Sequence, residues 1–247
     1  MGADQHIGWH ALAASALEWW HDAGVDTLVD DMPRDWFATP AAAPIATPTA
    51  LAPSVAAPAP VAAPAEMPAS FDAFLTWRNG PAVPEAPWGG VAFAATGPAT
   101  AELMVLVDCP ERDDGETLLS VPAGRLFYRM LAAIGTTRDA VHLASVCAKR
   151  PTAGRVHQDV EAQLAAIAQH HVGLVAPRRL LVLGNAASRA ILATDLADAR
   201  GRLHAFNHKT GKTGTVVSFH PRFLIEKPAA KPEAWRDLQM LMRNSDA

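Results

Sequence analysis

The chain has 247 residues, which is enough for one large domain and an appendage, and its net charge of -4 indicates no particular partner. Its two cysteines exclude a disulfide framework and a four-cysteine zinc site, and they suit a reducing cytoplasm. The first residues lack the basic and apolar pattern of a secretory signal, so we expect a cytoplasmic protein.

Charge is distributed unevenly along the chain. Residues 1–40 hold seven acidic residues and one arginine, whereas residues 198–247 hold nine basic and five acidic residues. Apolar residues at roughly helical spacing predict a helix over residues 8–22, with a second short helix before Pro33. We therefore expect residues 1–37 to form an acidic helical module with a role of its own.

Residues 38–70 are rich in alanine and proline. They contain eight prolines, and Glu66 is their one charged residue. Recurrent proline breaks any helix, which excludes a membrane span in the uncharged run from 36 to 65. In a polyproline conformation, at about 3.1 Å per residue, this linker would be a semi-rigid tether of roughly 100 Å.

From residue 71 to residue 247 the composition is that of a globular domain. Apolar runs predict four strands, over 102–108, 140–146, 178–185 and 214–221. Helical patterns follow them or lie between them, over 123–135, 157–175, 186–194 and 232–243. This alternation predicts a three-layer α/β fold in which a small, four-stranded, mainly parallel sheet lies between helices.

Polar or special residues lie at the carboxyl end of each predicted strand. They are Asp108, Ser145, Gly184 and His220. Because chemistry in such folds sits at the carboxyl ends of parallel strands, we expect these residues to meet at one edge of the sheet.

The segment "HKTGKTG" (208–214) contains Gly-Lys-Thr, as a phosphate-binding loop does. The first glycine of such a loop would lie five positions before Gly211, where the chain has Phe206, and the segment precedes a strand. We interpret it as a turn. His170 and His171 end a predicted helix, where they suit its dipole better than a metal site.

Basic residues surround the His-Pro dipeptide at 220–221. They are Arg200, Arg202, Lys209, Lys212, Arg222, Lys227 and Lys231. An ordinary solvated surface is one interpretation, but their position at a strand end favours a phosphate-binding rim. Asn185 begins a predicted helix, where we interpret it first as a cap and second as part of a phosphate site.

The segment "SFHPRFLIEKPAAKPEAWRDLQML" (218–241) resembles the C-terminal motif of family 4 uracil-DNA glycosylases. Three further segments resemble that family: "ARGRLHAF" (199–206), "RLFYRMLAAIGTTRDAVHLASV" (125–146) and "KRPTAGR" (149–155). "VLVDCPERDD" (105–114) stands where the family has its water-activating loop, and the head and linker resemble its alphaproteobacterial branch.

The resemblance implies a DNA-repair enzyme, associated with the nucleoid, that flips uracil or another damaged base out of DNA and hydrolyses its N-glycosidic bond. It implies that Asp108 positions the water, on a shorter arm than the family's glutamate, and that His220 stabilises the leaving base. A monomer whose partner is DNA, with no membrane association, is expected.

The base-binding positions depart from the family. Leu119 replaces a stacking phenylalanine and Ser145 a base-reading asparagine, while Cys109 and Pro110 complete the pocket loop. A lost stacking ring costs about 1–3 kcal/mol per base, so we expect weak or altered activity. Full activity would require another ring at the pocket, from Phe127 or Trp88.

The DNA-binding positions that the resemblance implies follow the His-Pro dipeptide. Phe223 or Leu224 would fill the gap that the flipped base leaves. The whole set is Pro221, Arg222, Phe223, Leu224, Lys227, Arg200, Arg202 and Asn185.

The family's iron–sulfur cysteines are missing. Phe74 stands at the first position and Lys149 at another, and two cysteines cannot ligate a four-cysteine cluster, so we expect no cofactor and no metal. We predict that Phe74 is buried and replaces the cluster by packing.

Two alternatives belong to other classes. One is a catalytically inactive DNA-binding paralogue, whose acidic module (1–37) recruits a repair or replication protein. The other is a single-strand-binding module with little preference for damaged duplex.

Overall fold

The computed structural model describes residues 67–120, 122–151, 156 and 158–243, and in the acidic head Ala14, Ser15 and Glu18. Those three residues are helical, in agreement with the helix predicted over 8–22. The remainder of the predicted head and nearly all of the linker lie outside the described residues. Contacts divide the chain into residues 1–59 and 60–247, and the fold below is that of the second unit.

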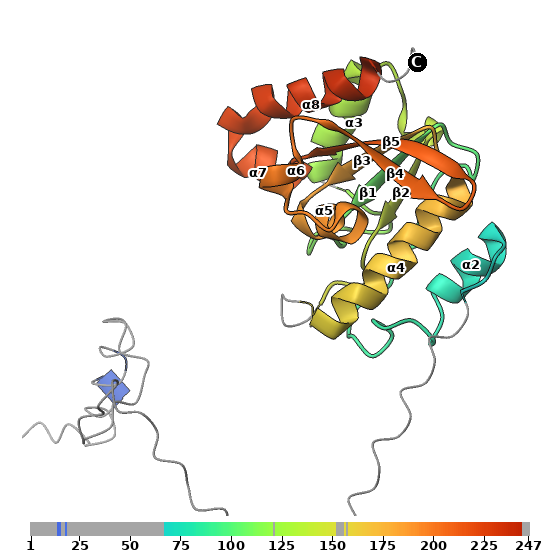
Figure 1. Ribbon diagram of the computed structural model, residues 1–247. Coiled ribbons are helices and arrows are strands. Elements are labelled where there is room, and N and C mark those ends of the chain that lie inside the picture. Colours follow the sequence, from blue (N-terminus) through green and yellow to red (C-terminus); the bar gives the residue numbers. More distant parts are fainter. Residues whose placement is uncertain are drawn as a thin grey trace, which may run out of the picture. The chain divides into compact units, whose positions relative to one another are not determined.

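A sheet of five strands forms the centre of this unit (Figure 1), with the order β2-β1-β3-β5-β4. The strands are β1 (Leu103–Val107), β2 (Val141–Ser145), β3 (Arg179–Leu183), β4 (Leu203–His208) and β5 (Gly211–Ser218). The neighbours β2-β1, β1-β3 and β3-β5 pair in parallel, and β4 is antiparallel to β5. The predicted α/β class is confirmed, whereas the predicted number of four strands is wrong.

The strand that the sequence did not reveal is β4, at the edge of the sheet. Its side chains alternate between exposed and half-buried, so it contains no continuous apolar run. It forms a hairpin with β5 through a turn at Lys209 and Thr210. The predicted turn is therefore confirmed, but β5 begins three residues earlier than expected.

Helices cover both faces of the sheet (Figure 1). One face packs against α3 (Ala123–Ala133), α7 (Pro221–Glu226) and α8 (Lys231–Arg243). The other packs against α4 (Gln158–Val175), α5 (Asn185–Leu192) and α6 (Leu196–Ala199). Every side chain of β1 is buried, because alternate residues of a central strand enter opposite cores. The three-layer prediction is thus confirmed.

The four predicted helices exist and differ at their ends by no more than two residues. Three short helices were not predicted: α2 (Phe71–Arg78), α6 and α7; the 3₁₀ turns η1 (Arg138–Ala140) and η2 (Pro228–Ala230) were not predicted either. The most important for the site is α7, because it carries Pro221, Arg222, Phe223 and Leu224, which the resemblance assigns to DNA binding. Within the described ranges, no helix combines the length and apolar character needed to cross a membrane.

Candidate active site

The carboxyl ends of the parallel strands bring four predicted residues to one edge. Asp108 follows β1, Ser145 ends β2, Gly184 follows β3, and His220 lies two residues after β5. The backbone N–H of Gly184 donates to the carbonyl of Ser218 at 3.2 Å, which continues the sheet beyond β3 and β5. The four residues therefore lie at the same edge of the sheet, at the ends of four different strands.

Asp108 points its carboxylate at the amino end of α5. Its Oδ1 accepts the backbone N–H of Ala187 at 2.7 Å, and the N–H groups of Asn185 and Ala186 also stabilise its charge. Burial nevertheless raises the pKa of Asp108 above its ordinary value. A Cβ at Gly184 would lie 2.3 Å from Oδ2, so only glycine lets the carboxylate lie against the chain there. Asp108 thus caps α5 from a distant part of the sequence.

The prediction that Asn185 caps α5 is wrong. Gly184 holds the N-cap position, and Asn185 is the first residue of the helix. The Asn185 Oδ1 instead accepts the backbone N–H of Leu196 at 2.8 Å, where α6 begins. A local pattern identified the helix start, but it could not identify a cap supplied by Asp108 through tertiary contact.

His220 is nearly buried, with 9% of its surface exposed. Its Nδ1 accepts the backbone N–H of Arg222 at 3.3 Å and so caps α7, whose first residue is Pro221. Burial, assisted by the Arg222 charge, lowers the pKa of His220 to about 4, so the ring is neutral at pH 7. With Nδ1 as the acceptor, the ring proton resides on Nε2. Nε2 is buried and has no hydrogen-bond partner among the described residues.

Glu111 is a site residue that the sequence interpretation missed. Its Oε1 lies 3.4 Å from Nδ1 of His220, and its Oε2 lies 3.4 Å from Arg222 and 3.8 Å from Arg150. Burial raises the pKa of Glu111, and the two arginines oppose that effect. Because His220 is neutral at pH 7, its contact with Glu111 is not an ion pair there. What could have identified it in the sequence is a glutamate at a position where family 4 uracil-DNA glycosylases have a glycine.

Asp114 organises the loop that carries Glu111. Its Oδ2 accepts the backbone N–H groups of Glu111 at 2.8 Å and Leu119 at 3.3 Å. Its Oδ1 accepts the backbone N–H and the hydroxyl of Ser120 at 2.8 and 3.1 Å. Leu119 adopts a φ of 53°, which is uncommon for a residue with a side chain. One carboxylate therefore closes the loop and stabilises this backbone conformation.

The proposed base-binding residues are only partly accessible. Leu119 is 2% exposed and belongs to the α3–α8 core together with Phe127, whose ring is fully buried. Trp88 packs with the core on the opposite face. Neither ring therefore replaces the stacking aromatic beside Leu119. Ser145 is half-buried, and its hydroxyl makes no hydrogen bond within the described ranges.

A sequence model described as "Uracil DNA glycosylase superfamily" matches residues 94–239, which include every strand and the whole of this edge. The chain belongs to the uracil DNA glycosylase superfamily.

Two relatives are type-4 uracil-DNA glycosylases. The one from Pyrobaculum aerophilum is 29% identical over 126 residues, which are 48% of this chain and 64% of the relative. The one from Archaeoglobus fulgidus is 24% identical over 152 residues, which are 57% of this chain and 75% of the relative. The match thus spans less than two thirds of the first relative.

One basic residue of the predicted phosphate-binding rim is engaged in contacts within this superfamily member. The Arg200 side chain is 13% exposed, donates to Glu233 at 2.8 Å and Asp237 at 3.0 Å, and lies 3.8 Å from the Phe219 ring centroid. These contacts fix Arg200 between the sheet and α8. Arg202 and Lys227 remain exposed.

Phe223 and Leu224, which were predicted to fill the gap left by a flipped base, lie on α7. Leu224 is 1% exposed in the core, and the Phe223 ring stacks on Phe219 at 4.8 Å. Ile225 is 40% exposed, although the sequence interpretation did not select it. Helical spacing explains the difference, because α7 buries Pro221 and Leu224 and turns Ile225 outward.

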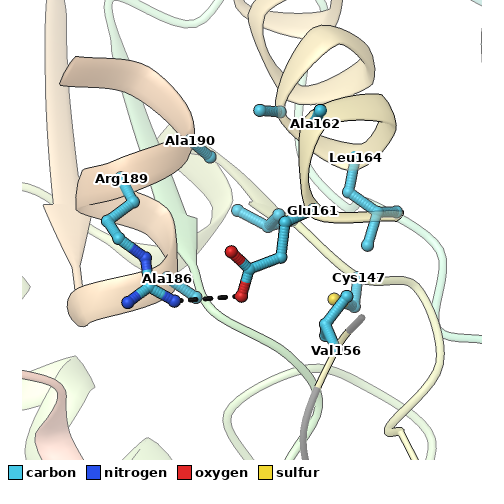
Figure 2. A pocket seen from close by; sticks show the side chains of 10 residues that line it. Cys147, Val156, Glu161, Ala162, Leu164, Ala186, Arg189 and Ala190 are labelled. Carbon is cyan, nitrogen blue, oxygen red and sulfur yellow. Dashed lines mark hydrogen bonds and ion pairs between the residues drawn. The ribbon is translucent and has the colours of Figure 1, made fainter. Parts of the chain in front are cut away.

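A cleft of about 250 Å³ lies at the same edge, on the side of α4 and α5 (Figure 2). Cys147 and Ala186 line it, and Glu161 and Arg189 approach each other to 3.0 Å beside it. None of the predicted catalytic residues lines this cleft. Burial raises the pKa of the Cys147 thiol, which is therefore protonated at neutral pH and a poor nucleophile.

The positions that the resemblance assigns to cluster cysteines are filled by internal contacts. Phe74 is fully buried, as predicted, with its ring 4.9 Å from that of His171. Lys149 donates to two backbone carbonyls, at 2.9 and 3.2 Å.

His142 and His171 form a buried pair, with 3.0 Å between their Nε2 atoms. Burial lowers the pKa of both rings, that of His171 to about 3.

His171 therefore belongs to a buried pair and not to a solvated helix end, which corrects the dipole interpretation; His170 instead contacts the carbonyl of Pro68. With two cysteines in the whole sequence, the residues do not fit a four-cysteine cluster. Among the described residues, no three His, Cys, Asp or Glu side chains are grouped as metal ligands.

Proposed function

We propose that this protein excises uracil or another damaged base from DNA by hydrolysing the N-glycosidic bond, with weak or altered activity. Its superfamily supports DNA as the substrate. The observation that carries the proposal is the unpartnered, buried Nε2 of His220 at the carboxyl edge of the sheet.

His220 would act on the departing base. When the glycosidic bond breaks, negative charge develops on the base, and a buried N–H donor stabilises it more strongly than water does. The pKa of about 4 keeps the ring neutral at pH 7, and the contact of Nδ1 with Arg222 orients it.

Asp108 would position the attacking water, but its geometry favours slow chemistry. One carboxylate oxygen is engaged by the N–H of Ala187, and the other lies against Gly184. Leu119 offers no ring for stacking. These two features support weak or altered activity in place of efficient uracil removal.

Binding to DNA would use the exposed part of the same edge. Arg202, Arg222 and Lys227 supply positive charge for phosphates. We propose Ile225 as the side chain that fills the gap left by the flipped base, in preference to Phe223 or Leu224, because it is already exposed on α7. We further propose that packing around Phe74 replaces the family's cluster and that the protein works without a cofactor.

The second candidate function is that of a catalytically inactive DNA-binding paralogue. The capping role of Asp108 favours it, because a carboxylate held by α5 is explained without chemistry. In this case residues 1–37 would recruit a repair or replication protein to DNA that the domain holds.

An excision assay separates the two functions. The protein is incubated at low salt with labelled single-stranded and double-stranded DNA that contain one uracil. We expect slow excision that falls on the order of 100-fold in His220→Ala, the typical cost of losing one such donor. The control His208→Ala removes an imidazole from the hairpin end of the sheet and should retain activity. Binding without excision, unchanged in His220→Ala, would support the inactive paralogue.

A further inference from the structure

Two arginines from different elements converge on one carboxylate beside His220. Arg150 follows β2, Arg222 lies on α7, and both guanidinium groups reach Oε2 of Glu111, at 3.8 and 3.4 Å. Arg150 is also oriented by donating to the carbonyl of Pro110 at 3.0 Å. The resulting group stands at the exposed rim of the site.

The geometry of this group leaves donors unused. Both arginine distances exceed the 2.7–2.9 Å or so of a close charge-assisted hydrogen bond. The Glu111 side chain is 16% exposed, whereas those of Arg150 and Arg222 are 38% and 55% exposed. The carboxylate is therefore the most buried member of the group, and the two more exposed guanidinium groups have more N–H donors than these contacts use.

We infer that Arg150 and Arg222 form a clamp for one phosphodiester of bound DNA, and that Glu111 occupies this clamp in the free protein as an internal substitute for the phosphate. A phosphate accepts two guanidinium groups with better geometry than this single carboxylate oxygen does. The clamp would hold the backbone next to the base that His220 contacts. The inference rests on the proposed DNA substrate, but it does not require excision.

The clamp has a consequence for affinity. Glu111 and the phosphate compete for the same two arginines, so binding must first weaken two ion pairs, and the carboxylate then repels the phosphate. Glu111 thus lowers the affinity for any DNA. Its removal should strengthen binding, which is the opposite of what a structural or catalytic carboxylate would produce.

Glu111→Gln in the full chain tests this inference by fluorescence anisotropy with an undamaged duplex. We expect roughly 10-fold tighter binding and a salt dependence steeper by about one phosphate contact. The matched control is Glu226→Gln, since Glu226 also pairs with Arg222, at 3.9 Å, but lies exposed on α7. The control removes the same charge and should change affinity by no more than about two-fold.

The arginines provide the second control. Glu111→Gln should bring no gain when Arg150 and Arg222 are both alanine. Glu111→Gly should also tighten binding, because it removes the same carboxylate and leaves no side chain that could contact DNA itself.

Two results would overturn the inference: equal gains in Glu111→Gln and Glu226→Gln, or a gain that persists without the arginines. Absence of DNA binding by every variant would overturn both this inference and the proposed function. Tighter binding by Glu111→Gln without excision would retain the clamp and reject the glycosylase.

Discussion

The roles of individual side chains at this edge follow from which of their polar atoms are already engaged. His220 is nearly buried, Asp108 is half-buried, and both begin a helix by capping it. Asp108 uses its carboxylate for that purpose, whereas His220 uses Nδ1 and retains Nε2. His220 caps α7 with one ring nitrogen and still has an N–H donor for a base on the other. The proposed function therefore depends on His220.

Asp108→Ala tests the capping role. The substitution removes the oxygen that accepts backbone N–H groups at the amino end of α5, so we expect a loss of about 1–2 kcal/mol in the free energy of unfolding. Denaturant unfolding measures it, with exposed Asp139→Ala as the control. Unchanged stability combined with lost excision would show that the carboxylate acts in chemistry alone.

At the scale of elements, two short segments shape the site. The loop between β1 and α3 carries Glu111, and α7 carries Arg222 toward it. Asp114 holds the loop through four hydrogen bonds to three residues, and His220 begins α7. The contact between Glu111 and Arg222 therefore depends on both segments, although neither is a long regular element.

Asp114→Asn tests the closure of that loop. An asparagine can replace only part of the four accepted hydrogen bonds, so we expect a loss of roughly 1–3 kcal/mol in stability. Amide hydrogen exchange should become faster at Glu111, Leu119 and Ser120, whose N–H groups Asp114 binds. Asp113→Asn, at an exposed neighbour, should leave both quantities unchanged. Unaltered exchange in Asp114→Asn would mean that packing of Leu119 alone closes the loop.

At the scale of the whole molecule, buried histidines connect elements that lie far apart in the chain. His142 on β2 meets His171 on α4, and Phe74 on α2 packs against His171. Both imidazoles are neutral in the folded protein because burial opposes their charge. This part of the core is therefore a source of acid sensitivity.

Stability should fall as pH decreases below about 6.5, the ordinary histidine pKa. The folded-state pKa of His171 is about 3, so between these values the unfolded chain binds the proton and the folded chain does not. The raised pKa values of Asp108 and Glu111 act in the opposite direction, so the comparison needs a variant. His171→Gln should flatten the decline by an amount on the order of several kcal/mol. Urea unfolding between pH 7 and pH 4 measures it. The control His208→Gln should flatten the slope much less, because a smaller degree of burial lowers the pKa of His208. Equal slopes in wild type and His171→Gln would contradict the prediction.

The sequence alone determined the order of strands and helices, because continuous apolar runs and helical spacing are local properties of the chain. It likewise placed His220 at a strand end and predicted the burial of Phe74. It did not reveal β4. Every second side chain of this edge strand is exposed, so its sequence contains no continuous apolar run.

Only the tertiary structure decided what the polar side chains do. Asp108 meets Ala187 across 79 positions of sequence, and Arg200 meets Asp237 across 37. Glu111 meets Arg150 and Arg222 only because the ends of β1, β2 and β5 lie at one edge of the sheet. Whether a carboxylate or guanidinium group caps a helix, joins two elements or is available to bind a ligand depends on the groups that it contacts. Those contacts exist only in the folded chain.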